Sequence, residues 1–217
     1  SAKNGMVVYL TKDVLKLNEI TVKSGLINES FSESTNSLSV IQQNNIRDSG
    51  ADHFNAILDR ISNLNWAGGT SRPRYFQIRG VGERSQYFGE GSPNFSIGYA
   101  LDDIDLSGLG MLGQLFDLNQ IEVFKGPQSS IFGSNAIGGL ISLRSNKPSN
   151  KNTYRYSLIV GNDGKKGVNG LVNFKIIQNL LLRISSSYNY SNGFRRNNYF
   201  NVDNSNKKDE IFVRAKL

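Results

Sequence analysis

Cysteine is absent from this 217-residue chain, and histidine occurs once, at His53. Without cysteine the chain has no disulfide framework, no redox CxxC site and no thiolate metal site. Its compartment stays open, because a cell-envelope protein need not use disulfides. A single histidine argues against a histidine-based metal cluster and against a catalytic triad. We therefore expect no catalytic residue, no metal site and no cofactor.

Long apolar runs are missing as well. No stretch approaches the ~20 consecutive apolar residues of a membrane-spanning helix. The N-terminus lacks a basic region followed by an apolar core, so no signal peptide is visible. The simplest interpretation is a mature or truncated start. Membrane-spanning strands stay possible, because each needs only ~9 to 11 alternating residues.

Charge of one sign is not concentrated in any segment. The 25 basic and 18 acidic residues give a net charge of +7, but the basic residues are scattered rather than gathered in one stripe. Nucleic-acid binding is therefore not expected, whereas contact with anionic lipid headgroups is compatible with this balance. With 38% hydrophobic and 20% charged residues the chain should fold, as one large or two small domains.

Glycine is frequent, with 22 residues, and two glycine-rich segments begin like nucleotide motifs. Gly133 and Gly138 have the spacing of a phosphate loop, but Gly139 and Leu140 stand where Lys and Ser or Thr are required. The segment 80–85 begins like a dinucleotide fingerprint and lacks its third glycine. Both motifs fail, which argues against a nucleotide-using enzyme. The glycines instead permit positive φ and close backbone approach in a compact turn between two strands.

An ordered set of short motifs is the most specific signal in the sequence. It comprises Ile78-Arg79-Gly80, Glu122 in an apolar strand, Lys125-Gly126-Pro127, Phe132-Gly133 and Ala136-Ile137-Gly138-Gly139. In this order these residues resemble the plug domain of TonB-dependent outer-membrane receptors. The resemblance implies a charged cluster that locks the plug against the barrel, here Arg79, Gly80, Glu122, Lys125, Gly126 and Pro127.

Two positions depart from the family pattern. Lys125 stands where Arg is usual, which keeps the charge but loses the planar bidentate fork. Asp103 stands where Gly commonly follows the aspartate of a turn. Asp102 and Asp103 are expected to form that turn rather than a catalytic carboxylate pair, because neighbours in a strand point to opposite faces.

Two further segments acquire a role through the same resemblance. Glu19-Ile20-Thr21-Val22-Lys23-Ser24 has the position and character of the TonB box, which would pair as an added strand with the periplasmic C-terminal domain of TonB. A plain edge strand is the alternative. The loop 81–96 and the loop around Leu109 would contact an extracellular small-molecule or chelate substrate, through Arg84, Tyr87, Phe88 and Leu109. Loop aromatics can equally be docking anchors.

Local patterns predict the elements before residue 148. Strands are expected at 19–24, 37–41, 74–80, 97–101 and 121–124, and a last strand after Gly139. Phe54, Ile57, Leu58 and Ile61 recur at helical spacing and predict an amphipathic helix over 51–61. His53 would lie on its flank, exposed or half-buried. A second, short helix is expected over 112–118.

After Pro148 the apolar period becomes two. Four strands are predicted, each with one apolar and one strongly polar face. Tight turns at 161–164 and 178–179 and a long polar loop over 191–208 would join them. Such strands, two of them with terminal tyrosines, suit a barrel wall between lipid and an aqueous lumen. A soluble sandwich whose polar face meets water is the alternative interpretation.

The expected fold is an α+β plug domain, a small mixed sheet with short helices, followed by antiparallel transmembrane β-barrel strands. Plugged barrels have about 22 strands, which at ~10 residues each need ~220 residues. Only 217 − 150 = 67 residues follow the plug. The barrel is therefore incomplete, and we expect a fragment of a longer receptor or a truncated gene product. The predicted parts are an extension (1–18), the TonB box and plug (19–148), and about four barrel strands (149–217).

These expectations combine into one functional prediction. The chain is predicted to be the N-terminal part of a TonB-dependent transporter in a Gram-negative outer membrane, with the plug facing the periplasm. It would be monomeric when full length and in contact with outer-membrane lipid. It would take up a scarce substrate such as a ferric siderophore, driven by proton-motive force through TonB, and would not be an enzyme. The alternative is a soluble or surface β-rich binding module without transport activity.

Overall fold

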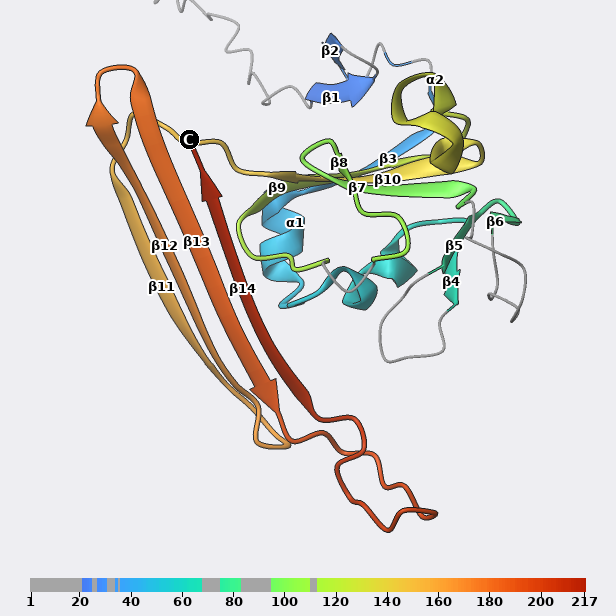
Figure 1. Cartoon of the computed structure of the whole chain (residues 1–217), viewed down its shortest axis with the longest axis vertical. Coiled ribbons are helices and arrows are strands. Elements are labelled where there is room, and N and C mark those ends of the chain that lie inside the picture. Colours follow the sequence, from blue (N-terminus) through green and yellow to red (C-terminus); the bar gives the residue numbers. More distant parts are fainter. Residues whose placement is uncertain are drawn as a thin grey trace, which may run out of the picture. The chain divides into compact units, whose positions relative to one another are not determined.

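The chain divides into two compact units, Ser1–Thr35 and Asn36–Leu217. The computed structural model describes residues 21–24, 27–30, 34, 36–67, 75–82, 95–109 and 113–217. In the first unit, β1 (Thr21–Ser24) pairs antiparallel with β2 (Ile27–Ser30). The second unit contains a globular part, defined here as residues 36–148, and a separate four-stranded sheet (Figure 1).

A five-stranded mixed sheet forms the centre of the globular part. Its order is β3-β9-β10-β7-β8, in which β10 pairs parallel with β7 and antiparallel with β9. The strands are β3 (Leu38–Gln42), β7 (Ile97–Leu101), β8 (Ile104–Asp105), β9 (Leu118–Phe124) and β10 (Gly139–Ser145). A smaller sheet is formed by β4 (Leu64–Ala67), β5 (Tyr75–Ile78) and β6 (Val81–Gly82). The strands predicted at 37–41, 97–101, 121–124 and after Gly139 are confirmed. The strand predicted at 74–80 is confirmed over Tyr75–Ile78, whereas residue 74 lies outside the described residues and residues 79 and 80 form a turn.

Short helical segments complete the globular part. They are α1 (Gln43–Asp48), η1 (Phe54–Ala56), η2 (Leu58–Arg60), α2 (Ser129–Phe132) and η4 (Gly133–Ala136). Their apolar side chains pack with those of the two sheets in one cluster, which includes Ile46, Phe54, Ile57, Leu58, Ile61, Phe76, Tyr99, Leu118, Ile121 and Ile141. Removing such side chains from water is the main favourable term in folding this part.

The helix predicted over 51–61 is wrong, although the four apolar residues on which it rested are all buried. The backbone here makes only the short i→i+3 bonds of two separate turns and is also bonded to the segment before β9. The Phe54 amide donates to the Gly113 carbonyl oxygen at 2.7 Å, and His53 forms an isolated β-bridge with Gln114. Only the two 3₁₀ turns η1 and η2 are therefore left of the helix.

His53 is accordingly buried, with 2% of its surface exposed, rather than exposed or half-buried as predicted. Its Nδ1 accepts a hydrogen bond from the Asn55 amide at 3.3 Å and caps η1. The helix predicted over 112–118 is also wrong in its described part, residues 113–118. There Leu115 donates its amide to the Asp52 carbonyl oxygen, which ties this segment to the one before η1.

The turn predicted at Asp102-Asp103 is confirmed and connects β7 to β8. Both residues have positive φ, 51° and 71°. Two positive φ values are the requirement of the two-residue hairpin turn whose twist matches its strands. Aspartate tolerates this region better than most residues, so Asp103 can stand where a glycine is commonly found.

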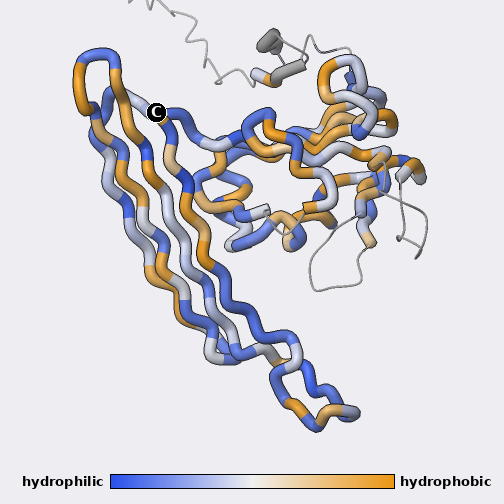
Figure 2. The backbone as a smooth tube through the Cα atoms, viewed as in Figure 1, coloured by the Kyte–Doolittle hydropathy of each residue, from blue (hydrophilic) through white to orange (hydrophobic). Residues whose placement is uncertain are grey.

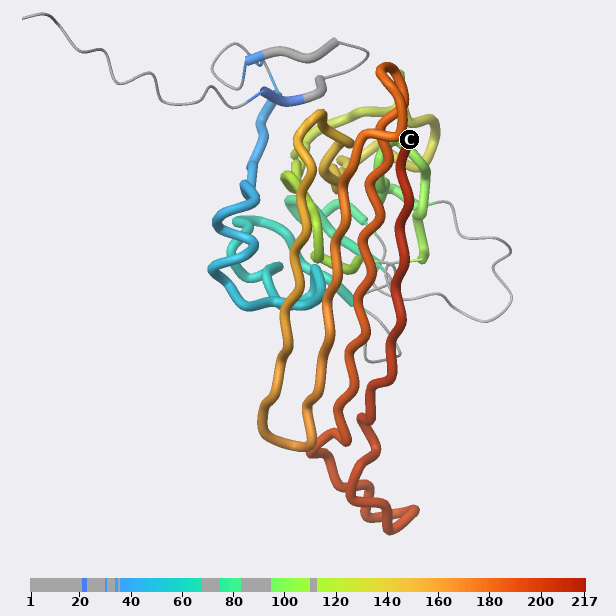
Figure 3. Tube along the Cα trace, turned by 90° about the vertical axis from the view of Figure 1, so that its left-hand side faces the viewer, coloured from blue at the N-terminus to red at the C-terminus, as the bar shows by residue number. Residues whose placement is uncertain are grey.

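The remaining sheet, called the wall below, is an antiparallel meander in sequence order (Figure 3). Its strands are β11 (Thr153–Val160), β12 (Lys166–Ile177), β13 (Leu180–Ser191) and β14 (Lys208–Lys216). All four predicted strands, both tight turns and the long loop are confirmed. In the described part of the chain, every helix is too short or too polar to cross a membrane.

The two faces of the wall differ sharply in burial and in polarity. Along most of each strand apolar and polar residues alternate (Figure 2). The apolar face is exposed: Tyr156 and Val160 each expose 86% of their surface and Ile211 exposes 77%. On the other face Asn173, Ser185 and Ser187 are buried. This is the reverse of a water-soluble sheet, which buries its apolar face.

A matched pair of glycine substitutions tests the close approach of β9 and β10. A Cβ on Gly139 would lie 2.6 Å from the Phe124 carbonyl oxygen, whereas a Cβ on Gly126 would meet nothing within 4 Å. We expect Gly139→Ala to lower the free energy of unfolding by about 1–3 kcal/mol. We expect Gly126→Ala to change it by less than about 0.5 kcal/mol. Thermal unfolding in detergent micelles measures both, and equal effects would contradict the close approach.

Candidate functional site

The globular part meets the polar face of the wall through ion pairs. In these pairs the acidic side chains belong to the globular part and the basic side chains to the wall. Asp117, just before β9, receives two hydrogen bonds from Arg183 of β13: one from Nε at 2.8 Å to Oδ2 and one from Nη2 to Oδ1. These side chains expose only 2% and 11% of their surface. A buried, bidentate ion pair of this kind fixes the relative orientation of its two side chains. Loss of either side chain leaves the other buried with an unpaired charge.

Asp102 makes a second contact with the wall beside the first. Its Oδ2 lies 2.9 Å from Lys216 Nζ of β14, and its two oxygens accept hydrogen bonds from the Ser145 amide (2.9 Å) and hydroxyl (2.7 Å). Partial burial of the carboxylate acts to raise its pKa, but these hydrogen bonds and the Lys216 charge outweigh it. The pKa of Asp102 therefore lies below its ordinary value.

Asp102, Asp117, Arg183 and Lys216 are called the latch below. Arg183 and Lys216 are cross-strand partners in the register of β13 and β14, so one rung of the wall presents both cations. Asp102 and Asp117 both have positive φ, 51° and 61°, and so stand in tight turns of the globular part. Local turn chemistry thus places the acids, and strand alternation places the bases.

Two further contacts lie near the other end of the wall, where the long loop leaves β13. Lys165 Nζ lies 2.6 Å from Asp52 Oδ2, and Gln114 Nε2 donates to Glu210 Oε2 at 3.0 Å. Asp52 and Lys165 expose 28% and 37% of their side chains. These two contacts are called the loop-end contacts. Their greater exposure makes the Asp52–Lys165 pair weaker than the buried pair in the latch.

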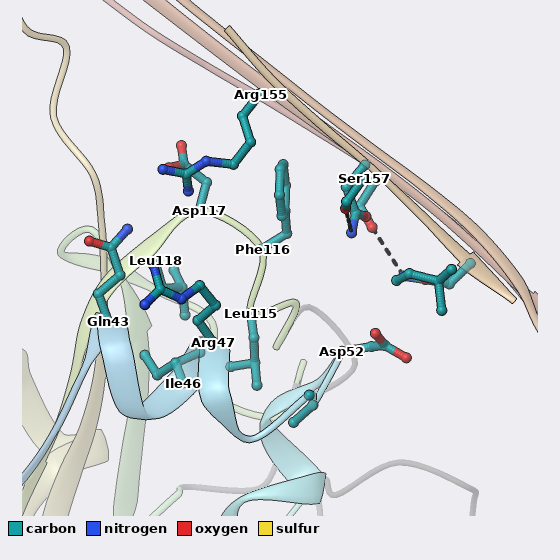
Figure 4. A pocket seen from close by; sticks show the side chains of 16 residues that line it. Gln43, Ile46, Arg47, Asp52, Leu115, Phe116, Asp117, Leu118, Arg155 and Ser157 are labelled. Carbon is teal, nitrogen blue, oxygen red and sulfur yellow. Dashed lines mark hydrogen bonds between the residues drawn. The ribbon is translucent and has the colours of Figure 1, made fainter. Parts of the chain in front are cut away.

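A cavity of about 290 Å³ lies between the globular part and the wall (Figure 4). Its floor includes Ile46, Leu115 and Phe116, and its other side includes Arg155, Ser157 and Asn169 of β11 and β12. Figure 4 shows side chains from both parts facing this space. Within the described residues no group of His, Cys, Asp and Glu side chains could hold a metal ion.

The residues predicted to lock the plug fall into two places. Arg79 Nη2 donates to Ser37 Oγ at 2.6 Å and Lys125 Nζ donates to Ser62 Oγ at 2.8 Å. Burial lowers the pKa of Lys125, and the charge of Arg79 lowers it further. The two cations are therefore close enough to repel each other. Gly80 (φ 83°) follows Arg79, and Gly126 and Pro127 follow Lys125.

Glu122 lies apart from these two cations. It is fully buried on β9, where Gln120 Nε2 donates to its Oε1 at 2.5 Å and Arg144 Nε lies 3.7 Å from its Oε2. The structure therefore brings Arg79 and Lys125 together and places Glu122 with Arg144. A locking role for these residues stays a prediction.

Several other predicted site residues lie outside the described residues: Glu19 and Ile20 of the TonB box, and Arg84, Tyr87 and Phe88 of the ligand loop. Thr21, Val22, Lys23 and Ser24 form β1. Leu109 is exposed, at 48% of its surface, in the loop that follows β8.

Sequence reasoning missed the acids that contact the wall. No local pattern singles out Asp52 or Asp117, and at Asp102 the pattern indicates only a turn. The available signal was the row of basic residues at alternate wall positions, Arg183, Arg214 and Lys216, which a polar lumen alone does not require. Such a row needs opposite charges facing it, since buried charges are paired.

Comparison with known proteins identifies the family to which this arrangement belongs. The family described as TonB-dependent Receptor Plug Domain matches residues 30–140, just over half of the chain. The chain belongs to this family. The globular part is accordingly its plug domain.

Relatives agree with this assignment. The chain is 27% identical over 147 residues to the ferrioxamine B receptor of Salmonella typhimurium (strain SL1344), a match that covers 62% of this chain and 19% of that receptor. The structure resembles the ferric yersiniabactin uptake receptor from Yersinia pestis with a TM-score of 0.70 at 18% identity, over 85% of this chain and 29% of that one.

A second solved structure gives the same result. The pyoverdine outer membrane receptor from Pseudomonas aeruginosa PAO1 matches with a TM-score of 0.64 at 16% identity, over 78% of this chain and 24% of that one. These matches establish the fold as a plug domain followed by antiparallel barrel strands, as predicted. The chain spans less than a third of the length of each of these relatives.

The buried pair of the latch should be sensitive to loss of one partner. We expect Arg183→Ala to destabilise the contact of plug and wall by about 3–5 kcal/mol, because Asp117 is left buried without its partner. Arg196→Ala is the matched control, since Arg196 and Asp203 form an ion pair that is 63% and 82% exposed. Arg196→Ala should change the free energy of unfolding little, because an exposed ion pair contributes little to stability. Urea unfolding in detergent micelles compares them, and similar midpoints for both variants would contradict a latch.

Asp102 should make the contact of plug and wall sensitive to acid. Its folded-state pKa lies below the ordinary value, so the charged carboxylate stabilises the fold at neutral pH. That contribution is lost as pH falls through the folded-state pKa. The difference in unfolding free energy between wild type and Asp102→Asn should therefore be largest near neutral pH and shrink below about pH 4. A difference independent of pH would exclude this role for the charge.

Proposed function

We propose that this chain is the plug and first wall strands of a TonB-dependent transporter that imports a ferric siderophore across a Gram-negative outer membrane. The observation that carries the proposal is the inverted wall: its apolar face is exposed and its polar face is buried against the plug. Lipid can cover the first face and the plug fills the space behind the second. The end of the wall that carries the long loop would face outward, since extracellular loops of such barrels are the longer ones.

The names of the relatives support the substrate class. The matched proteins are receptors for ferrioxamine B, ferric yersiniabactin and pyoverdine. This chain would therefore serve a ferric chelate of the siderophore class, which it would carry as cargo. The family is one of receptors, and no covalent chemistry is needed for the proposed transport.

The alternative of a soluble β-rich binding module requires that other parts of the chain cover the apolar face of the wall. Tyr154, Tyr156 and Leu158 expose 70%, 86% and 75% of their surfaces instead. An exposed apolar strip of this extent suits a membrane rather than water. Its two-residue alternation favours the transporter over the soluble module.

TonB coupling is part of the proposal. Residues 19–24 would form the TonB box, and within it β1 presents an extended strand that pairs with β2 on one edge. A two-stranded hairpin is marginally stable by itself. A strand of TonB could therefore add to β1 or replace β2, and the force would reach the plug through residues that include Arg79, Glu122 and Lys125.

Iron uptake by the full-length receptor tests the proposal. In a Gram-negative strain without siderophore receptors of its own, the receptor should import radioactive iron from at least one siderophore in a panel. Val22→Pro should retain binding of that siderophore and lose import, because proline removes a strand hydrogen bond that TonB needs. Val22→Ile, which keeps the β-branched strand residue, is the control. Import by Val22→Pro at the wild-type rate would show that residues 19–24 are not a TonB box.

A further inference from the structure

The apolar face of the wall carries charge at one end. Lys166 of β12, Tyr190 of β13 and Asp209 of β14 are cross-strand partners in the row next to the long loop. The following row and those beyond it, in a wall that the structure describes throughout, contain no charged residue on this face; the following row consists of Leu158, Val168, Tyr188 and Ile211. The exposed apolar face is therefore amphipathic along its length.

A second lysine joins this row from the end of the long loop. Lys207 directly precedes β14, and its Nζ lies 5.1 Å from the centre of the Tyr190 ring. The Tyr190 hydroxyl donates a hydrogen bond to Asn192 Oδ1 at 2.8 Å, which orients the ring under the ammonium group. Lys166, Tyr190 and Lys207 are called the basic rim below.

Both lysines of the basic rim are exposed and can accept an external anion. The ion pairs of the wall use other cations, namely Lys165, Arg183, Arg196 and Lys216. Neither Lys166 nor Lys207 has a carboxylate partner in the part of the chain that the structure describes. Asp209 opposes them in the same row, so the net charge there is 2 − 1 = +1. Each ammonium group offers three donors, which suits the oxygens of a phosphate.

The basic rim lies at the edge of the surface that lipid would cover. On β12, 176 − 166 = 10 residues separate Lys166 from Ile176 near the opposite end of the strand. This is about 33 Å along the strand. At the tilt of barrel strands it corresponds to a height of about 25 Å, which is the height of a lipid-facing band. The rim is thus at the level of lipid headgroups, where tyrosine is also enriched.

The apolar face is hollowed below the rim. A groove of about 330 Å³ lies around Gly170 and Ser186, and its lining includes Tyr154, Tyr156, Val172 and Ile184. A Cβ on Gly170 would meet only the Ser186 hydroxyl oxygen, at 3.4 Å, so the missing side chain leaves room rather than relieving a clash. The groove begins 170 − 166 = 4 residues from the rim, about 13 Å along the strand. At this depth a lipid presents its acyl chains.

We propose that the basic rim and the groove together bind one lipid of the outer leaflet, a phosphorylated and multiply acylated glycolipid of the lipid A type. Its phosphate would lie between Lys166 and Lys207, and one acyl chain would fill the groove. The inference rests on the proposed function, which places the end with the long loop outside the cell. The outer leaflet of a Gram-negative outer membrane is rich in lipid A, which carries both phosphates and several acyl chains. Clustered lysines at a membrane surface attract such anionic headgroups.

Binding of fluorescent lipid A to the purified full-length receptor in detergent micelles tests the rim. Lys166→Gln and Lys207→Gln should each weaken binding about fivefold, and together about 25-fold. Lys175→Gln is the matched control, because Lys175 lies near the opposite end of the same strand, and it should leave binding unchanged. Asp209→Asn should strengthen binding, since it removes the opposing charge, and a damaged fold would not produce that gain. Wild-type affinity in the double lysine variant would overturn the site.

Two further comparisons test the groove and the class of lipid. Gly170→Val should fill the groove, weaken binding of lipid A several-fold and leave binding of its deacylated headgroup unchanged. Equal weakening for both ligands would overturn the acyl-chain site. Phosphatidylglycerol should bind at least tenfold more weakly than lipid A, and equal affinity would overturn the choice of a glycolipid.

Import of radioactive iron by the native receptor separates this site from the proposed function. A receptor that binds lipid A through the rim but imports no chelate from the siderophore panel keeps the lipid site and loses the transport function. Import without lipid A binding that depends on Lys166 and Lys207 keeps the transport function and overturns the lipid site.

Discussion

Burial of the polar face of the wall is the constraint on which the rest of the structure depends. A sheet that turns its apolar face outward has to satisfy hydroxyl, amide and charged groups on the inside, because unpaired polar groups are costly to bury. The plug supplies partners for the charged ones. Asp117 and Asp102 face Arg183 and Lys216, and Asp52 faces Lys165. The plug domain and the wall are therefore complementary in charge, and neither surface would be stable against an apolar one.

The plug meets this demand by means of its turns. Its core is apolar and contains aromatic residues such as Phe76 and Tyr99, whose stacked rings have centroids 5.5 Å apart. Two of the acids that reach the wall, Asp102 and Asp117, stand outside that core at positions of positive φ, where aspartate is tolerated. The apolar core therefore stabilises the plug sheet, while the acids in the turns bind the wall. A cavity of about 290 Å³ also lies between the plug and the wall.

Much of the fold was predictable because it depends on local signals. The period of two after Pro148 indicated four strands with the right turns, and the ordered motif from Ile78 to Gly139 indicated the plug. The helix predicted over 51–61 was wrong for a reason that no local pattern contains. Its apolar spacing reports burial, which is correct, but its backbone groups bond to residues near Gln114, about sixty positions away. Short apolar spacing cannot distinguish a helix from two 3₁₀ turns that bond to a distant segment.

The sequence by itself determined the family, the alternation of the wall and the identity of the charged residues, because these depend on residue type and on spacing along the chain. Only the tertiary structure decided which charges meet. Glu122 lies with Arg144 rather than with Arg79 and Lys125, and Asp117 rather than any motif residue receives Arg183. The reason is physical: an ion pair depends on distances of a few ångströms between side chains. Residues 66 positions apart reach such distances only when the folded plug lies against the wall.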